Sequence, residues 1–361
     1  MTLSQAARTL ERTGPDRHRV WNVDPEEIAG IDYPWTDAHF FVDPLQDQVF
    51  VGHQNRLFVL DANTGKPGAV RECDLSFASP WGESFDPKRK VVFEGDDRAI
   101  TAMDLKSGKT LWSYPAPRGV MFGRTAPSLG PDGTVYAGTS SGSATVYALD
   151  GTTGKLKWKK DFPGIFDGRT APAAGPRGEV YVGILGSEDT HPVYVLNASD
   201  GEAVRQIPLE RKLTEEPTVG PDGTLFLGYW EGDLEARAPS GATKWSFEPP
   251  DGGSASMPAL EPGGRLVVAS RAGHIYGLDK AGKPSWTVDT GEEGLKSGAQ
   301  VSPRGLLVVL DDDGQLDGLA PDAAAFQAQL ARKTSDRPAG SIRKEGNQLY
   351  VGGIQLSIRG R

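Results

Sequence analysis

Short apolar strands that end in a small residue recur along the chain at a nearly constant interval. The first is Val49-Phe50-Val51-Gly52, and the copies end at residues 52, 95, 138, 183, 228, 269, 309 and 352, so the period is 40–45 residues. A repeat of this length is typical of folds in which similar units stack side by side. Eight copies account for nearly all of the 361 residues.

Turn sequences divide each repeat into four strands. A turn such as Gly130-Pro131-Asp132-Gly133 precedes the apolar strand, and a second hairpin follows it. A third turn, Asp-x-x-Thr-Gly-Lys at 150–155, precedes a strand with a tryptophan. Proline presets φ and glycine accepts the left-handed conformation, so these are hairpin turns. We therefore predict an all-β fold, a β-propeller of eight four-stranded antiparallel blades, with seven blades as the alternative.

The last repeat is incomplete, because no tryptophan strand follows residues 348–358. Residues 19–24, with Trp21, read like the tryptophan strand at 110–114. We predict that this N-terminal strand completes the last blade, which would remove two open sheet edges. The expected organisation is an N-terminal arm (1–18) and a single propeller domain (19–361). Residues 321–338 have a helical composition and replace the outer strand of the seventh repeat, so a helical insertion is expected there.

The pattern Ala-Met-Asp-x-x-Ser-Gly-Lys-x-x-Trp at 102–112 resembles the repeat of pyrroloquinoline-quinone (PQQ)-type, or quinoprotein-like, propellers, and so does the segment 148–158. In that family the tryptophan of one blade packs against the next blade. The chain looks most like the propeller subunit of the bacterial outer-membrane β-barrel assembly machinery, and like propellers attached to sensor kinases. The resemblance implies the propeller fold and a protein-binding role.

Charge and composition narrow the function classes. The net charge of −9 disfavours nucleic acid as a partner. No apolar run is long enough to span a membrane, and the N-terminal segment has no signal-peptide core. We expect a monomeric propeller that is cytoplasmic as written, or periplasmic if an export signal was trimmed. The single cysteine, Cys73, precludes an intrachain disulfide and is read as a packed thiol.

Propellers bind ligands at the mouth of the central channel, where the loops that enter the innermost strands converge. The repeat places at this mouth Asp37, Pro80, Arg124, Arg169, Thr214, Ala255, Lys296 and Pro338. Their neighbours include Trp35, His39, Trp81, Glu83, Glu215 and Glu216. The residues predicted to bind a ligand or partner are Trp35, Asp37, Trp81, Arg124, Arg169, Glu215 and Lys296.

Two arginines are the most distinctive feature of this mouth. Arg124 and Arg169 stand in the repeated sequence Gly-Arg-Thr-Ala-Pro of neighbouring repeats. Two guanidinium groups at equivalent positions can grip a carboxylate or a phosphate. The alternative is that they pair with acidic residues across the mouth: Asp37, Asp167, Glu215 or Glu216.

Neither a cofactor nor a metal is expected. A resemblance to the quinoprotein dehydrogenases would imply a calcium-binding set of carboxylate and amide side chains and, usually, a disulfide between adjacent cysteines. A single cysteine cannot form that disulfide. The acidic run 311–317 aligns with a hairpin turn of the other repeats, and the five histidines lack metal-ligand spacing. We predict a non-catalytic scaffold that binds a protein or peptide. The alternative is a lyase, cyclase or hydrolase acting on a small anionic substrate, with His39, Glu215 and Glu216 as acid–base groups.

Overall fold

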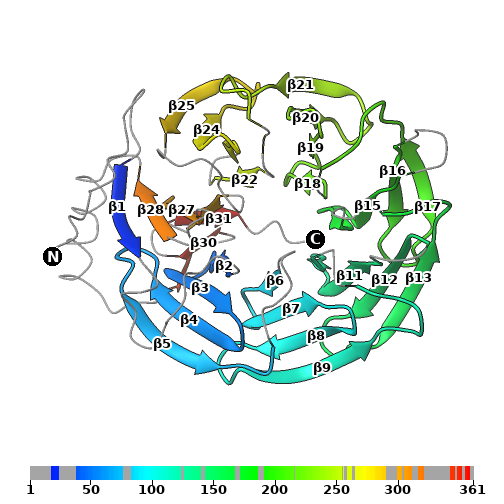
Figure 1. Ribbon diagram of the computed structural model, residues 1–361, viewed down its shortest axis with the longest axis horizontal. Helices are drawn as coiled ribbons and strands as arrows, with labels where there is room; N and C mark the ends of the chain where they lie inside the picture. Colours follow the sequence, from blue (N-terminus) through cyan, green and yellow to red (C-terminus); the bar gives the residue numbers. More distant parts are fainter. Residues whose placement is uncertain are drawn as a thin grey trace, which may run out of the picture.

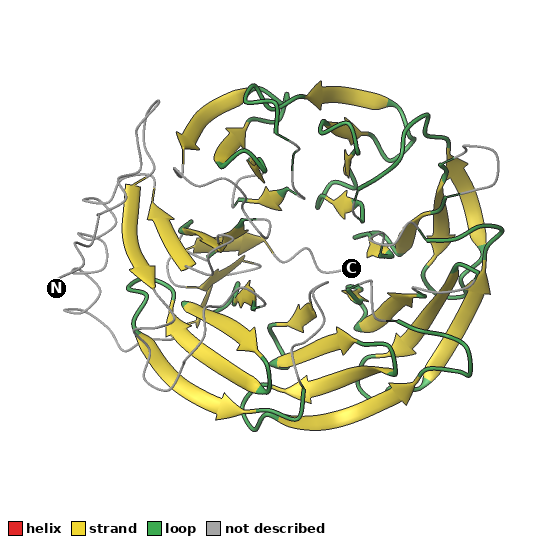
Figure 2. Cartoon of the chain, viewed as in Figure 1, coloured by secondary structure: helices red, strands yellow, loops and turns green. Residues whose placement is uncertain are grey.

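The computed structural model shows seven four-stranded antiparallel blades arranged in a ring (Figure 1). It describes residues 18–23, 38–75, 83–122, 126–139, 143–166, 171–185, 191–214, 216–253, 255, 258–261, 265–289, 299–302, 305–310, 316–320, 342–345, 348–351 and 354–357. These residues form strands and turns and no helix (Figure 2). Residues 1–17 of the expected arm (1–18) and the expected helix (321–338) lie outside them, and His18, the last residue of that arm, begins the first strand.

Each of the first six blades is one continuous stretch of chain, ordered from the axis outward. Blades 1 to 3 are β2 (His39–Val42), β3 (Gln48–His53), β4 (Arg56–Asp61), β5 (Pro67–Glu72); β6 (Glu83–Asp86), β7 (Val91–Gly95), β8 (Ala99–Asp104), β9 (Lys109–Pro115); and β10 (Ser128–Leu129), β11 (Thr134–Gly138), β12 (Thr145–Asp150), β13 (Leu156–Asp161). Blades 4 to 6 are β14 (Ala173–Ala174), β15 (Glu179–Gly183), β16 (Val193–Asn197), β17 (Ala203–Ile207); β18 (Thr218–Val219), β19 (Leu225–Gly228), β20 (Leu234–Arg237), β21 (Thr243–Phe247); and β22 (Ala259–Leu260), β23 (Leu266–Ala269), β24 (His274–Leu278), β25 (Pro284–Asp289).

The seventh blade joins the two ends of the ring. Its inner strands are β26 (Gln300–Val301), β27 (Leu307–Leu310) and β28 (Leu316–Ala320), and its outer strand is β1 (His18–Val23) from the N-terminus. β1 runs antiparallel to β28, and Trp21 lies opposite Gly318. The N-terminal strand therefore closes the propeller, as predicted, but on another blade than the one predicted.

The prediction of eight blades is wrong. The last repeat forms a separate three-stranded sheet of β29 (Ile342–Glu345), β30 (Gln348–Val351) and β31 (Ile354–Ser357). In the described part of the chain, no outer strand follows β28 or β31 in its own repeat, and one N-terminal tryptophan strand, β1, is available to complete a blade. That strand pairs with β28, so the ring closes after seven blades.

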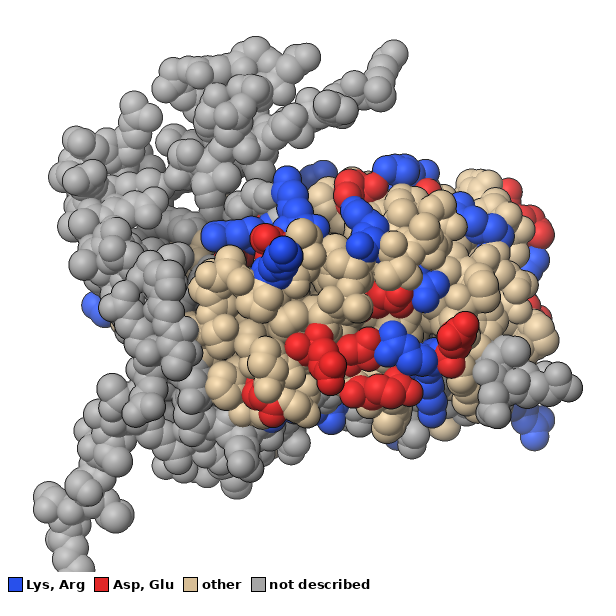
Figure 3. Space-filling model, turned by 90° about the horizontal axis from the view of Figure 1, so that it is seen from above, with Lys and Arg blue, Asp and Glu red and all other residues tan. Residues whose placement is uncertain are grey.

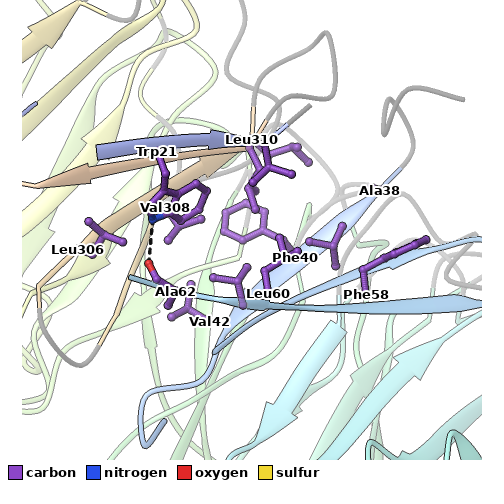
Figure 4. Packing of buried hydrophobic residues seen from close by; sticks show 14 residues of the cluster. Trp21, Ala38, Phe40, Val42, Phe58, Leu60, Ala62, Leu306, Val308 and Leu310 are labelled. Carbon is purple, nitrogen blue, oxygen red and sulfur yellow. Dashed lines mark hydrogen bonds between the residues drawn. The ribbon is translucent and has the colours of Figure 1, made fainter. Parts of the chain in front are cut away.

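The hydrophobic core lies between blades rather than within one blade. The cluster at the closing seam combines Trp21, Val308 and Leu310 of blade 7 with Phe40 and Leu60 of blade 1 (Figure 4). Similar clusters occupy the other seams. Because each sheet buries its face only against its neighbour, the blades depend on one another for stability.

One hydrogen bond recurs from seam to seam. An indole Nε1–H of an outermost strand donates to a backbone carbonyl in the third turn of the next blade, directly after the turn's first residue. The pairs are Trp112 to Gly151 (3.1 Å), Trp158 to Ala198 (2.9 Å), Trp245 to Lys280 (3.0 Å) and Trp21 to Ala62 (3.0 Å). Trp21 thus docks blade 7 on blade 1 in the way the other tryptophans dock their blades.

Arginine takes this role in the two blades without a tryptophan strand. Arg71 of blade 1 donates from Nη1 to the Leu105 carbonyl at 3.3 Å, and Arg205 of blade 4 donates from Nη2 to the Pro239 carbonyl at 2.6 Å. Both acceptors occupy the same turn position as those of the tryptophans. At the remaining seam, between blades 6 and 7, that position is residue 321, outside the described residues.

The receiving turn is built for this contact. In blade 3, Asp150 Oδ1 accepts hydrogen bonds from the N–H groups of Thr152 and Thr153 and from the Thr153 hydroxyl. These bonds, with the Thr153 hydroxyl first, lower the pKa of Asp150. Gly154 has φ +70°, and a Cβ there would lie 2.6 Å from the Trp112 ring. Glycine is therefore required both by the backbone and by the docked indole.

An inner contact also secures the closing seam. On β26, Gln300 accepts a hydrogen bond from the Val42 N–H through Oε1 and donates one to the Phe40 carbonyl through Nε2, each at 2.8 Å. Its side-chain amide thereby pairs with the backbone of β2 much as a strand would. Blades 7 and 1 are joined near the axis by Gln300 and near the rim by Trp21.

Replacing Trp21 with alanine tests the closure. Trp21 is 8% exposed, so Trp21→Ala should lower the free energy of unfolding by about 3–5 kcal/mol, because a buried indole and its hydrogen bond are lost. The matched control is Leu111→Ala on β9, whose side chain is 54% exposed and whose change should be within about 0.5 kcal/mol. Urea denaturation measures both. Equal, small effects would mean that β1 does not hold the ring closed.

Candidate functional site

Strand direction assigns the loops to two faces of the ring. The loops that lead from an outer strand into the next innermost strand share one face with the hairpins between the second and third strands. We call this the mouth face. Between blades 2 and 6 its loops span 116–127, 162–172, 208–217 and 248–258.

Most of the predicted site residues lie outside the described part of the chain: Trp35, Asp37, Pro80, Trp81, Arg124, Arg169, Glu215, Lys296 and Pro338. Of Glu83 only the backbone, at the start of β6, is described. The described residues are His39, Thr214, Glu216 and Ala255. His39 is half-buried at the start of β2, opposite Gly52, and Glu216 is half-buried just before β18. His39 and Glu216 belong to blades 1 and 5, which are not neighbours. The proposed acid–base set stays a prediction.

The described mouth loops are pinned to neighbouring hairpins by their backbones. Ile165 and Leu185 exchange two N–H···O bonds of 3.1 and 3.0 Å. Thr214 donates to the Gly228 carbonyl at 3.0 Å, and the Trp230 N–H donates to the Lys212 carbonyl at 3.1 Å. The described parts of these loops therefore have backbones that are bonded to the neighbouring hairpins.

Glu235 of β20 anchors a buried polar network in blade 5. It accepts hydrogen bonds from the Tyr229 hydroxyl (2.6 Å), the Thr243 hydroxyl (2.5 Å) and two guanidinium nitrogens of Arg237 (3.1 and 3.0 Å). Burial would raise the pKa of Glu235, but the bonds from Thr243, Tyr229 and Arg237 outweigh it and lower that pKa. Burial, and then the bond to Glu235, raise the pKa of Tyr229. Glu235 is therefore a stable carboxylate that fixes Tyr229.

Two cations of the loop stack on two consecutive aromatic residues of the hairpin. The Arg211 guanidinium lies 3.8 Å from the ring centre of Tyr229, and the Lys212 ammonium lies 4.8 Å from that of Trp230. Arg211 also forms an ion pair with Asp233 at 2.5 Å. These contacts add cation–π attraction to the backbone pairing.

The next mouth loop is held by Asp251. Its Oδ1 accepts from the Ser270 hydroxyl and from the Gly253 N–H, both at 2.9 Å, and its Oδ2 lies 3.0 Å from His274 Nδ1. Ala255 forms an isolated bridge with Ser270 and donates its N–H to the Gly232 carbonyl at 2.8 Å. The predicted mouth residue Ala255 thus ties blade 6 to the hairpin of blade 5.

The described residues include the single cysteine and potential metal ligands. Cys73 is buried just after β5, and burial raises the pKa of its thiol to about 11, as suits a packed thiol. Among the described residues, no three side chains of His, Cys, Asp or Glu gather to hold a metal ion. No helix in the same residues is long and apolar enough to cross a membrane.

Comparison with known proteins identifies the family. The sequence model described as outer membrane protein assembly factor BamB matches residues 8–164, 142–228 and 189–355. The chain belongs to this family. The predicted PQQ-like repeat and the predicted likeness to the assembly subunit are confirmed. No curated protein matches the chain.

A solved structure with the BamB fold is similar as well. The crystal structure of BamB from Moraxella catarrhalis superposes with a TM-score of 0.57 at 15% sequence identity, covering 86% of this chain and 100% of that chain. At this identity the likeness establishes the fold alone. The function of a BamB-family propeller has to be argued from its surface.

The exposed apolar side chains are a feature that the sequence interpretation missed. Among the residues whose exposure is described, Met121, Ile165 and Trp230 are exposed on the mouth face. The other large exposed apolar residues of this set lie on outer strands (Val70, Leu111, Leu156 and Val204). Trp230 stands in a hairpin turn, away from the tryptophan position of the repeat. An aromatic pair at a turn, Tyr229-Trp230, was the signal that could have revealed it.

The Glu235 network predicts a pH-dependent contribution to stability. Glu235→Gln should cost about 2–3 kcal/mol at pH 7, because charge-assisted bonds to Arg237, Tyr229 and Thr243 weaken. Since the pKa of Glu235 is lowered by folding, its contribution is complete above the pKa of an unfolded glutamate and disappears as the pH falls through the lower folded value.

Urea denaturation at pH 7 and below pH 4 measures this contribution. The difference between the wild type and Glu235→Gln should shrink at the lower pH, and the exposed control Glu210→Gln should stay within about 0.5 kcal/mol of the wild type. A gap that widens on acidification would contradict the assignment of Glu235 as the stabilising carboxylate.

Proposed function

We propose that the chain is a non-catalytic scaffold that binds a protein or peptide on its mouth face. The observation that carries the proposal is the presence of exposed apolar side chains on this face, presented from loops whose backbones are pinned. Exposed apolar groups on a rigid support lower the entropic cost of association and are typical of protein interfaces.

The family supports the same conclusion. The description of the family as an outer membrane protein assembly factor favours a partner involved in that assembly, and with it the periplasmic alternative for the compartment. A repeat propeller offers many loops on one face, which suits it to contact a large partner.

The two mouth arginines are part of the proposal. Arg124 and Arg169 belong to the loops 116–127 and 162–172, which also expose Met121 and Ile165. A partner with a carboxylate beside an apolar residue would meet both features there. Trp35, Asp37, Trp81, Glu215 and Lys296 are proposed to complete the ring of partner contacts.

The arginine pair provides the test. Arg124→Ala with Arg169→Ala should weaken capture of partners from a cell lysate by about tenfold or more, as quantified by mass spectrometry. The control combines Lys66→Ala and Lys155→Ala, two exposed lysines in turns of the opposite face, and should leave capture unchanged.

One result would contradict the scaffold. If the arginine variant captures the same partners, and a small anion such as phosphate stabilises the wild type but not the variant against heat, the arginines hold a small anionic ligand. That outcome would favour the enzyme alternative, in which His39, Glu215 and Glu216 act as acid–base groups.

A further inference from the structure

We propose that Trp230 is the anchor of a docking surface on blade 5, and that its partner is a peptide segment with an apolar side chain flanked by lysine or arginine. The inference rests on the proposed function and specifies the partner's chemistry for this sector of the mouth face. The docking surface consists of Glu210, Arg211, Lys212, Trp230 and Glu231.

Trp230 differs from the tryptophans that build the ring. Its side chain is 55% exposed, whereas Trp21 and Trp158, which dock blades, are 8% and 9% exposed. It lies in the hairpin between β19 and β20, where it joins no seam. Tryptophan concentrates binding energy at interfaces, because a large rigid surface becomes buried when a partner arrives.

The anchor is fixed before any partner binds. Its backbone N–H donates to the Lys212 carbonyl, and the Lys212 ammonium lies over the indole ring. The preceding residue, Tyr229, is 1% exposed and is held by Glu235 on its hydroxyl and by Arg211 on its ring. A preorganised anchor loses little conformational freedom on binding, so more of its buried area contributes to affinity.

The charges around the anchor indicate a basic partner. Glu210 and Glu231 are exposed next to Arg211 and Trp230. The positive charge of Arg211 is paired with Asp233, and that of Lys212 lies against the indole ring, so the two glutamates carry the charge that faces a partner. Figure 3 views the side of the ring that is drawn at the top of Figure 1, and it shows several acidic side chains in its lower half with basic side chains between them. An acidic border attracts lysine and arginine and speeds their approach.

A second copy of this chain fits this surface poorly. The chain carries a net charge of −9, so two copies repel one another at long range. The exposed apolar residues on outer strands are also poor anchors. Val204, for example, is 58% exposed on the edge strand β17, and scattered residues of this kind are ordinary for protein surfaces.

Three labelled nonapeptides serve as probes of the full chain. The first has a central leucine flanked by lysine and arginine, the second has the same leucine flanked by glutamate, and the third has the basic residues and a central serine. Fluorescence anisotropy should show that the first peptide binds best. Trp230→Ala should weaken it at least tenfold, and Glu210→Gln with Glu231→Gln should weaken it and reduce its salt dependence.

Controls separate binding from folding. Leu111→Ala removes an equally exposed apolar side chain elsewhere and should bind the first peptide like the wild type. Trp230→Phe should keep the thermal midpoint of the wild type and retain part of the affinity. Both variants and Trp230→Ala should melt within a few degrees of the wild type, because their side chains are exposed.

The outcomes distinguish this inference from the proposed function. Preferred binding of the acidic peptide, or equal binding of the first peptide by Trp230→Ala, would overturn the inference and leave a mouth-face scaffold of other specificity. Binding of none of the peptides, together with a lysate capture that the arginine variant does not change, would overturn both.

Discussion

The hydrogen bond from an outermost side chain to a turn carbonyl of the next blade is the contact on which this ring depends. Each blade is a small sheet that cannot bury its faces alone, so its stability comes from the neighbours it touches. An indole or guanidinium supplies both a buried surface and a directed donor. The donor finds a carbonyl in a turn that has a left-handed glycine. In five of the six described turns the first residue is an aspartate or asparagine, and in blade 5 it is Ala238. Because blade 7 uses the same contact to reach blade 1, the ends of the chain are joined by the interaction that joins its interior.

The repeat explains how much of the fold could be predicted. Strand positions, turns and the closing role of Trp21 follow from local patterns, because proline, glycine and alternating apolar residues act within a few positions of the chain. The number of blades does not follow, since it depends on which open edge the spare strand meets. The substitution of Arg71 and Arg205 for tryptophan was also hidden, because an arginine in an exposed strand carries no sign of a carbonyl 34 residues away.

On the mouth face, too, contacts between distant segments could not be predicted from local sequence patterns. Alignment of the repeats placed Arg124 and Arg169 on the loops 116–127 and 162–172, and the described ends of both loops lie on this face. The alignment did not predict that Arg211 and Lys212 lie over the rings of Tyr229 and Trp230. These residues are brought together by backbone hydrogen bonds between the loop that enters blade 5 and a hairpin of that blade. The buried carboxylates on this face stabilise the structure. Glu235 and Asp251 hold loops and hairpins in place, so the side chains exposed above them are available for a partner.

The strand that closes the ring can be tested by covalent trapping. In a Cys73→Ser background, Asn22→Cys with Asp317→Cys places thiols on facing residues of β1 and β28, where the Asn22 amide now donates to Asp317 at 2.8 Å. The comparison pair, Asn22→Cys with Gln355→Cys, would join β1 to β31. Mass spectrometry after mild oxidation should find the disulfide in the first pair and not in the second. A disulfide in the second pair alone would contradict the seven-bladed closure.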